Sequence, residues 1–318
     1  MITLEAVYVV AGLAFAGFAL LSVRDRSNKR RFGNAAFWGL LAASFLFGSY
    51  LGDVANGALV LALVVLAGLG ALGIGKPHTS TPEERRESAR ARGNWLFGPA
   101  LIVPATALFG TLFLKNAHLG GVPLLDSKQV TLISLAAGAV LALGAAIAWL
   151  KPPLLAPLQE GRRLIDTIGW AAILPQMLAS LGAVFALSGV GKAVGEIATR
   201  YLPLDRPYEA VLAYCIGMAA FTAIMGNAFA AFPVMTAAIG LPLIVHQFHG
   251  NPAIMAAIGM LSGFCGTLTT PMAANFNVVP AALLELPDRN GVIKVQLPTA
   301  GLMLTGNTIL MYCLVFRF

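Results

Sequence analysis

The chain alternates between long apolar runs and short polar segments. Most runs are about twenty residues long, the length that an α-helix needs to cross about 30 Å of hydrocarbon. This pattern predicts an all-α polytopic membrane protein with about eight transmembrane helices, a re-entrant helical hairpin and one discontinuous helix. The apolar runs cover residues 3–23, 32–50, 55–75, 95–114, 129–150, 164–187, 208–245, 252–286 and 296–316.

Composition and charge agree with a membrane protein. Of the 318 residues, 58% are hydrophobic and 11% are charged, and the mean hydropathy is +0.80. Soluble domains carry about 25% charged residues, so the deficit excludes an ordinary cytosolic enzyme. The three cysteines have no metal-ligand spacing, which predicts buried free thiols and no metal site. The net charge of +7 comes without a basic-aromatic pattern, which argues against nucleic-acid binding.

The lysines and arginines predict the orientation of the chain. The loops at residues 24–31, 76–92, 151–163 and 287–295 hold 15 of the 21 basic residues, and the positive-inside rule places such loops in the cytoplasm. Basic residues follow the first run and none precedes it, the reverse of a signal peptide. Both termini are therefore expected outside, provided that the run at 208–245 enters and leaves on the same side.

One segment differs from the apolar runs. Between residues 188 and 207, Lys192, Glu196 and Arg200 recur every four residues, on a different helical stripe from the neighbouring apolar side chains. This spacing predicts a short amphipathic helix. It fits an arm lying in the membrane interface and equally a solvated connector helix with ion pairs four residues apart.

The 75 residues between Glu209 and Glu285 contain no Asp, Glu, Lys or Arg. Near the middle of the first overlong run, Gly226 is suited to end one helix and Asn227 to cap the next. This predicts a helix, a tight turn and a second helix, as in a re-entrant hairpin with Ala228 at its tip. Two full spans joined at the surface, or a small-residue packing face, are the alternatives.

A second polar cluster follows in the next run. Gly263 and Gly266 are suited to stop a helix, Thr270 to cap the next one, and Pro271 to take its first position. The expected structure is a broken transmembrane helix whose second half presents free N–H groups and whose exposed carbonyls coordinate Na⁺. A proline-kinked helix is the alternative. The polar side chains predicted at this site are Thr267, Thr269, Thr270, Asn275 and Asn277.

Both clusters favour an anion held without a cationic side chain, by helix N-termini and by amide and hydroxyl donors. The last run contributes one more candidate, Asn307, within the sequence Thr305-Gly306-Asn307-Thr308. Asn307 is expected either to line the site or to form hydrogen bonds between helices.

These motifs resemble the ion-transporter superfamily of secondary carriers. In that superfamily each repeat has three helices, an interfacial arm, a re-entrant hairpin with a Ser-Asn-Thr-type tip, a helix broken at Thr-Pro, and a last helix. The order of segments from residue 95 to 316 is similar to one such repeat. The tip here has Gly226 in place of Ser and Ala228 in place of Thr, so the resemblance implies no ion binding by hydroxyl groups there.

More closely, Gly-Asn-Ala-Phe-Ala-Ala-Phe-Pro-Val and Thr-Thr-Pro-Met-Ala-Ala-Asn-Phe-Asn resemble the larger membrane subunit of bacterial two-component 5-oxoproline transporters. The resemblance implies a bacterial inner-membrane location and a partner, a smaller integral membrane subunit that supplies the inverted repeat. Carriers of this superfamily need two inverted repeats around a midplane site, and this sequence shows one hairpin and one break.

The sequence thus predicts three leading helices with a basic loop (1–94), three scaffold-type helices (95–187), an interfacial arm (188–207) and a transport-type part (208–318). The expected function is a subunit of an elevator-type secondary transporter for a small carboxylate such as 5-oxoproline, driven by Na⁺ or H⁺, without a cofactor. The alternatives are an accessory scaffold subunit and a membrane-embedded enzyme. The site residues expected are Gly226, Asn227, Ala228, Gly266, Thr267, Thr269, Thr270, Pro271, Asn275, Asn277 and Asn307.

Overall fold

Among the residues that the structure describes, the secondary structure is helical apart from a short ladder between β1 (His118–Leu119) and β2 (Val122–Pro123) and an isolated bridge between Ile2 and Leu125. The computed structural model describes residues 1–75, 80–115, 117–119 and 121–317. It divides into two units, Met1–Thr167 and Ile168–Phe318.

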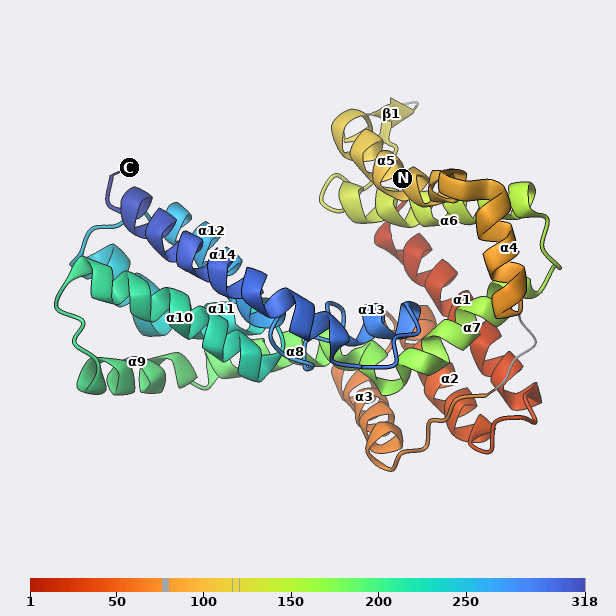
Figure 1. Ribbon diagram of the computed structural model, residues 1–318, viewed down its shortest axis with the longest axis horizontal. Coiled ribbons are helices and arrows are strands. Elements are labelled where there is room, and N and C mark those ends of the chain that lie inside the picture. The colour runs from red at the N-terminus through yellow and green to blue at the C-terminus, as the bar shows by residue number, and fades with distance from the viewer. Residues whose placement is uncertain (76–79, 116, 120, 318) are drawn as a thin grey trace. The chain divides into compact units, whose positions relative to one another are not determined.

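Unit 1 is built from two antiparallel helix pairs and three further helices. α1 packs along α2, and α5 packs along α6, as Figure 1 shows within this unit. Phe37 and Trp38 on α2 are fully buried, and Trp38 stacks on Phe15 of α1 with 5.9 Å between ring centroids. The elements are α1 (Leu4–Arg24), α2 (Arg31–Phe47), α3 (Asp53–Gly68), α4 (Pro82–Arg92), η1 (Gly93–Leu96), α5 (Phe97–Phe109), η2 (Gly110–Leu114), α6 (Val130–Leu150) and α7 (Ala156–Ile168).

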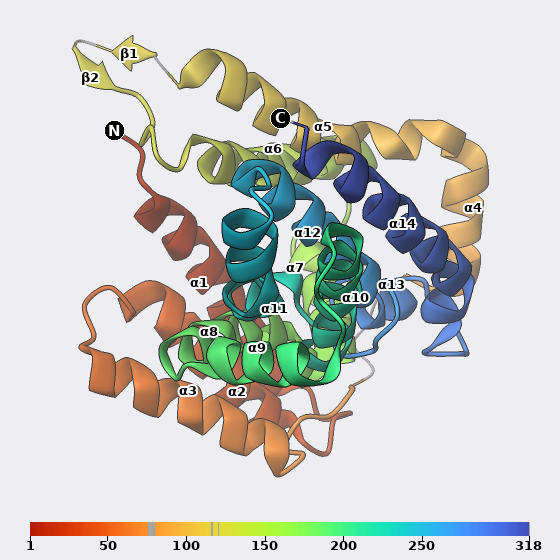
Figure 2. The same cartoon turned by 90° about the vertical axis from the view of Figure 1, so that its left-hand side faces the viewer.

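Unit 2 is organised around α10, which packs against α11, α12 and α14. Figure 2 shows these helices with α9 beside them. The buried core of unit 2 includes Tyr214, Met218, Met255 and Met311. The elements are η3 (Gly169–Ile173), α8 (Leu174–Leu187), α9 (Val190–Tyr201), α10 (Pro207–Met225), α11 (Ala228–Met235), η4 (Thr236–Gln247), α12 (Pro252–Thr267), α13 (Val278–Leu283) and α14 (Gly291–Val315).

Six helices among the described residues are long and apolar enough to cross a membrane. They agree with a multi-pass membrane protein, although α3 and α12 are shorter than a full span. α9 occupies the middle of the segment predicted to form an amphipathic helix. The six helices are Leu4–Arg24, Glu83–Leu114, Val130–Leu150, Pro207–Met225, Ala228–Gln247 and Gly291–Val315.

Two expected spans are wrong in their extent. The run at 55–75 was expected to be helical throughout, but α3 ends at Gly68 and Gly70 has a φ of 62°. The run at 164–187 was expected to be one helix, but it is interrupted at Gly169, where φ is 61°. In both places a glycine adopts the left-handed backbone conformation that ends helices. The hydrophobic pattern did not predict these helix ends, because the surrounding residues are apolar on both sides.

Candidate functional site

The first part of the site is the tight turn between α10 and α11. Gly226 has a φ of 77°, and its N–H donates to the carbonyl of Thr222 at 2.6 Å. The Asn227 side-chain oxygen then accepts a hydrogen bond from the N–H of Phe229 at 2.8 Å, which caps the start of α11. Gly226 and Asn227 therefore end and begin helices as their residue types predicted.

This turn lies directly against the interruption that follows α12. A Cβ atom added to Gly226 would come within 2.7 Å of both the Cβ atom and the carbonyl oxygen of Met272. The close approach and the left-handed φ both require glycine. Two separate interruptions of the helical backbone thus meet at one point.

The interruption itself differs from the expected broken helix. α12 ends at Thr267, and the chain then forms turns until α13 begins at Val278. Thr270 was expected to cap a second half-helix and Pro271 to be its first residue, and this prediction is wrong. The Thr270 hydroxyl accepts from the N–H of Met272 at 3.2 Å within a turn. α13 has six residues, so the interruption is not followed by a long half-helix that directs its N-terminus at the site.

Asn277 stabilises this irregular segment through hydrogen bonds to its backbone. Its side-chain N–H₂ donates to the carbonyls of Thr267 at 2.8 Å and Thr270 at 2.6 Å, and the residue is fully buried. The Thr267 carbonyl would otherwise lack a partner where the helix stops, whereas the Thr270 carbonyl also accepts from the N–H of Ala273 at 3.3 Å. The sequence predicted that exposed carbonyls of this segment bind a cation, whereas these two accept from Asn277. The Asn277 oxygen, in contrast, is buried without a hydrogen-bond donor.

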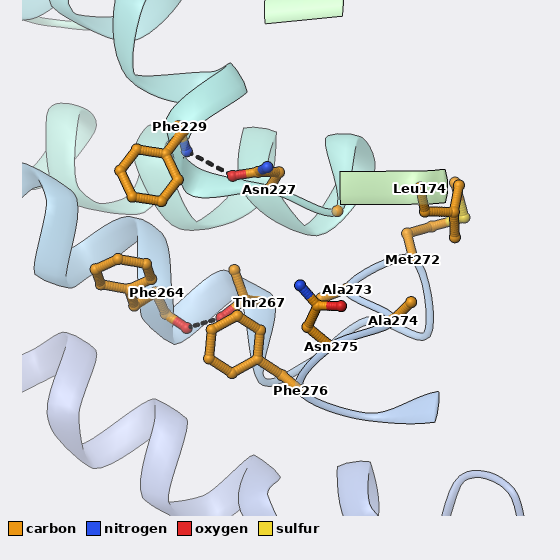
Figure 3. Close-up of a pocket in the computed structure, with 11 residues that line it drawn as sticks. Leu174, Asn227, Phe229, Phe264, Thr267, Met272, Ala273, Ala274, Asn275 and Phe276 are labelled. Atoms are coloured by element: carbon orange, nitrogen blue, oxygen red, sulfur yellow. Dashed lines mark hydrogen bonds between the residues drawn. The ribbon is translucent and has the colours of Figure 1, made fainter. Parts of the chain in front are cut away.

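A pocket of about 370 Å³ lies where the turn and the interruption meet. Figure 3 shows Asn227 and Phe229 reaching it from the turn, and Phe264, Thr267, Asn275 and Phe276 reaching it from α12 and the interruption. The residues that line it are uncharged: Leu174, Gly226, Asn227, Phe229, Phe264, Thr267, Met272, Ala273, Ala274, Asn275 and Phe276. The pocket thus combines aromatic walls with amide and hydroxyl groups and the start of α11.

Four of the predicted site residues line this pocket, namely Gly226, Asn227, Thr267 and Asn275. Thr270 and Asn277 are buried within the interruption, and Pro271 lies exposed in its turn. Ala228 is fully buried on the first turn of α11.

The remaining predicted residues lie elsewhere in unit 2. Gly266 and Thr269 line a second, apolar hollow between α10 and α14. The Asn307 side chain faces α12, where its nitrogen lies 3.6 Å from the Cys265 sulfur. Two roles were expected for Asn307, lining the site or bonding between helices. The structure shows the second, a contact from α14 to α12.

Sequence reasoning missed the aromatic walls of the pocket. Phe229 and Phe264 have centroids 6.0 Å apart in an edge-to-face arrangement, and Phe264 and Phe276 are 6.5 Å apart. Two of the three rings flank polar residues that had been singled out, since Phe229 follows the turn and Phe276 separates Asn275 from Asn277. That adjacency was the signal available in the sequence.

The cap at Asn227 is open to a direct test. Asn227→Ala removes the acceptor of the Phe229 N–H, and we expect a loss of about 1 kcal/mol in the free energy of unfolding. Asn227→Ser retains a capping oxygen and is expected to lose much less. Thermal unfolding in detergent compares the two variants, and equal losses would contradict a capping role.

The fold and this site define a helical membrane protein of several spans. The chain belongs to the family described as "Protein of unknown function (DUF979)", whose sequence profile matches residues 5–316. Neither the curated proteins nor the solved structures contain a significant match to the chain.

Proposed function

We propose that the chain is a subunit of a secondary active transporter that moves a small carboxylate across the bacterial inner membrane. The proposal rests on one observation, the meeting of the capped turn at Gly226–Asn227 with the interruption after α12 in an uncharged pocket. Irregular backbone at membrane depth is tolerated where it is buried in protein or lines a cavity. Transporters use such interruptions to bind substrates and ions.

The lining of the pocket supports a small substrate with a flat polar ring, such as 5-oxoproline. The rings of Phe229, Phe264 and Phe276 offer apolar faces and edges to a ring. The amides of Asn227 and Asn275 complement a lactam, which has one donor and one acceptor. The first turn of α11 favours the carboxylate, because helix N-termini attract anions.

The proposed coupling is to Na⁺ or to H⁺, and two buried oxygen atoms support Na⁺, because neutral amide and hydroxyl oxygens can ligate a metal cation but do not take up a proton. The Asn277 side-chain oxygen and the Thr222 hydroxyl oxygen are buried without hydrogen-bond partners. Unpaired buried polar atoms cost about 1–3 kcal/mol each, and a coupling cation would satisfy them. Thr222 lies in the last turn of α10, directly before the tight turn, and Asn277 braces the interruption.

We further propose a re-entrant hairpin, an elevator-type movement and a smaller integral membrane partner with the inverted repeat. Each arm of the hairpin, α10 and Ala228–Gln247, has the length of a full span. The proposal that they return at mid-depth is supported by the contact of their turn with the interruption after α12. In this arrangement both termini face outward, and α9 lies in the interface against η4, which it contacts.

Reconstitution into lipid vesicles tests the proposal. We expect uptake of labelled 5-oxoproline by vesicles that hold this chain with the smaller membrane subunit, driven by a Na⁺ or H⁺ gradient, and none by this chain alone. Asn275→Ala, which removes a pocket amide, is expected to raise the KM about tenfold. Asn94→Ala in η1 serves as the control, because Asn94 is exposed and lies in unit 1.

Two outcomes would contradict the proposal. Full uptake by this chain alone would refute the two-subunit arrangement. The second outcome is an unchanged KM and kcat both in Asn275→Ala and in a variant with alanine in place of Phe229, Phe264 and Phe276. It would indicate that the partner holds the binding site. The chain would then be an accessory scaffold.

A further inference from the structure

Unit 1 buries two carboxylates and one guanidinium in a single cluster. Arg162 and Asp166 lie four residues apart on α7 and so project from one face of the helix, with exposures of 4% and 7%. Asp25, in the turn after α1, completes the cluster with a side-chain exposure of 9%. Charged side chains are almost never buried this deeply unless they are paired. The partners of each group therefore decide its charge.

Arg162 is paired with Asp25. Its Nη2 lies 3.0 Å from the Asp25 Oδ2, and its Nη1 donates to the carbonyl of Leu21 at 3.0 Å. The N–H and hydroxyl of Ser27 donate to the Asp25 Oδ1 at 2.9 and 2.6 Å. Burial raises the pKa of Asp25, but the Ser27 hydrogen bonds and Arg162 outweigh it, and the pKa lies below its usual range. Asp25 is thus ionised and neutralises Arg162.

Asp166 has neutral partners. Its Oδ1 accepts from the Trp38 indole N–H at 2.7 Å and from the Asn34 side-chain N–H₂ at 2.8 Å. Asn34 is held in place because its own oxygen accepts from the N–H of Gly73 at 2.8 Å. Arg30 also lies at the start of α2, but it donates to the carbonyls of Gly70 and Leu72.

Two charged groups act on Asp166, and they oppose each other. Arg162 attracts its negative charge and Asp25 repels it. Burial raises the pKa of Asp166 above its usual range, and the hydrogen bonds from Trp38 and Asn34 only partly oppose this. α7 lies outside the six helices that are long and apolar enough to span a membrane.

We propose that Asp166 is a proton-binding site, whose carboxyl group takes up a proton in the folded protein at a pH at which exposed carboxyl groups are still ionised. Two carboxylates against one guanidinium leave one surplus negative charge in a buried cluster, and a proton on Asp166 removes it. The Oδ1 still accepts both hydrogen bonds, and the Oδ2 takes the proton. Loss of the proton places a second negative charge near Asp25 in the buried cluster. The site is independent of the proposed transport function.

Infrared spectroscopy of the purified wild-type chain is the first test. We expect the C=O stretching band of a protonated carboxylic acid at a pH just above the titration range of exposed carboxyl groups, and its loss in Asp166→Asn. Asp205→Asn is the control, since Asp205 is exposed in unit 2, and it is expected to keep the band. Absence of the band from the wild type, or its persistence in Asp166→Asn, would overturn the proposal.

Thermal unfolding gives a second, independent readout. Asparagine mimics the protonated carboxyl group of Asp166 and needs no proton, so Asp166→Asn is expected to keep or raise the Tm at neutral pH. Asp25→Asn leaves Arg162 buried without its partner and is expected to lower the Tm by about 5 °C or more. A loss in Asp166→Asn as large as in Asp25→Asn, or a failure of that variant to fold, would show that the charge is needed and overturn the proposal.

The stability of the wild type is expected to fall as the pH rises through the titration of Asp166. A carboxyl whose pKa is raised on folding binds its proton more tightly in the folded state, so its contribution to stability is full below the unfolded pKa and is lost as the pH rises through the folded pKa. The wild type is therefore expected to lose Tm relative to Asp166→Asn as the pH rises above about 4. The opposite slope, or stabilisation of the wild type by Na⁺ in place of protons, would contradict a proton site.

Discussion

Gly226→Ala is expected to abolish uptake by the reconstituted transporter and to lower the free energy of unfolding by about 2–4 kcal/mol. An L-residue at a φ of 77° is strained, and the added methyl group would lie 2.7 Å from backbone and side-chain atoms of Met272. The turn would have to withdraw from the interruption, which opens the pocket between them. Uptake in vesicles and thermal unfolding measure the two effects.

Gly306→Ala is the matched control for this substitution. Gly306 lies within α14, and a Cβ atom added there meets nothing within 4 Å. Alanine in a helix is favoured over glycine by about 1 kcal/mol, so this variant is expected to be as stable as the wild type or slightly more stable. If Gly226→Ala kept both normal uptake and normal stability, the contact of the turn with Met272 would have no functional role.

Asn277→Ala is expected to cost about 2–4 kcal/mol, because it leaves the buried carbonyl of Thr267 without a donor and removes one of the two donors to the carbonyl of Thr270. The interruption would then collapse or become mobile, and uptake would be lost with a fall in kcat. Asn277→Asp should be at least as damaging, since a carboxylate would face two carbonyl oxygens with no proton to donate. Thermal unfolding and vesicle uptake check both variants.

Asn275→Ala separates structure from binding at the same interruption. Asn275 is exposed and lines the pocket, whereas Asn277 is fully buried. We therefore expect Asn275→Ala to raise KM with little change in Tm, and Asn277→Ala to lower Tm. Equal effects of the two variants on Tm would show that Asn277 does not brace the segment.

The individual long helices could be predicted from the sequence, because each is recognised from the hydrophobicity of its own residues. The runs that became α1, α6 and α14 are apolar along most of their length, and the structure has helices of 21, 21 and 25 residues there. The turn at Gly226–Asn227 was predictable for the same reason, because glycine ends helices and asparagine caps them through contacts with the nearest residues.

The interruption after α12 was predictable only in part. The glycines, threonines and proline indicated that the helix stops, but they placed its continuation at Pro271. The structure begins α13 at Val278, because Asn277 reaches back ten residues to the carbonyl of Thr267. A hydrogen bond over that separation depends on how the segment folds and not on residue preference.

The sequence by itself determined that this is a helical membrane protein of several spans, with two polar interruptions in a stretch without charge. Those features follow from hydrophobic length and helix-end preferences, which act between near neighbours. Only the tertiary structure decided that the turn at Gly226 touches Met272, that Asn307 faces α12, and that Asp166 lies buried beside Trp38. These contacts join residues that are 42 to 128 positions apart, and packing of the helices selects them.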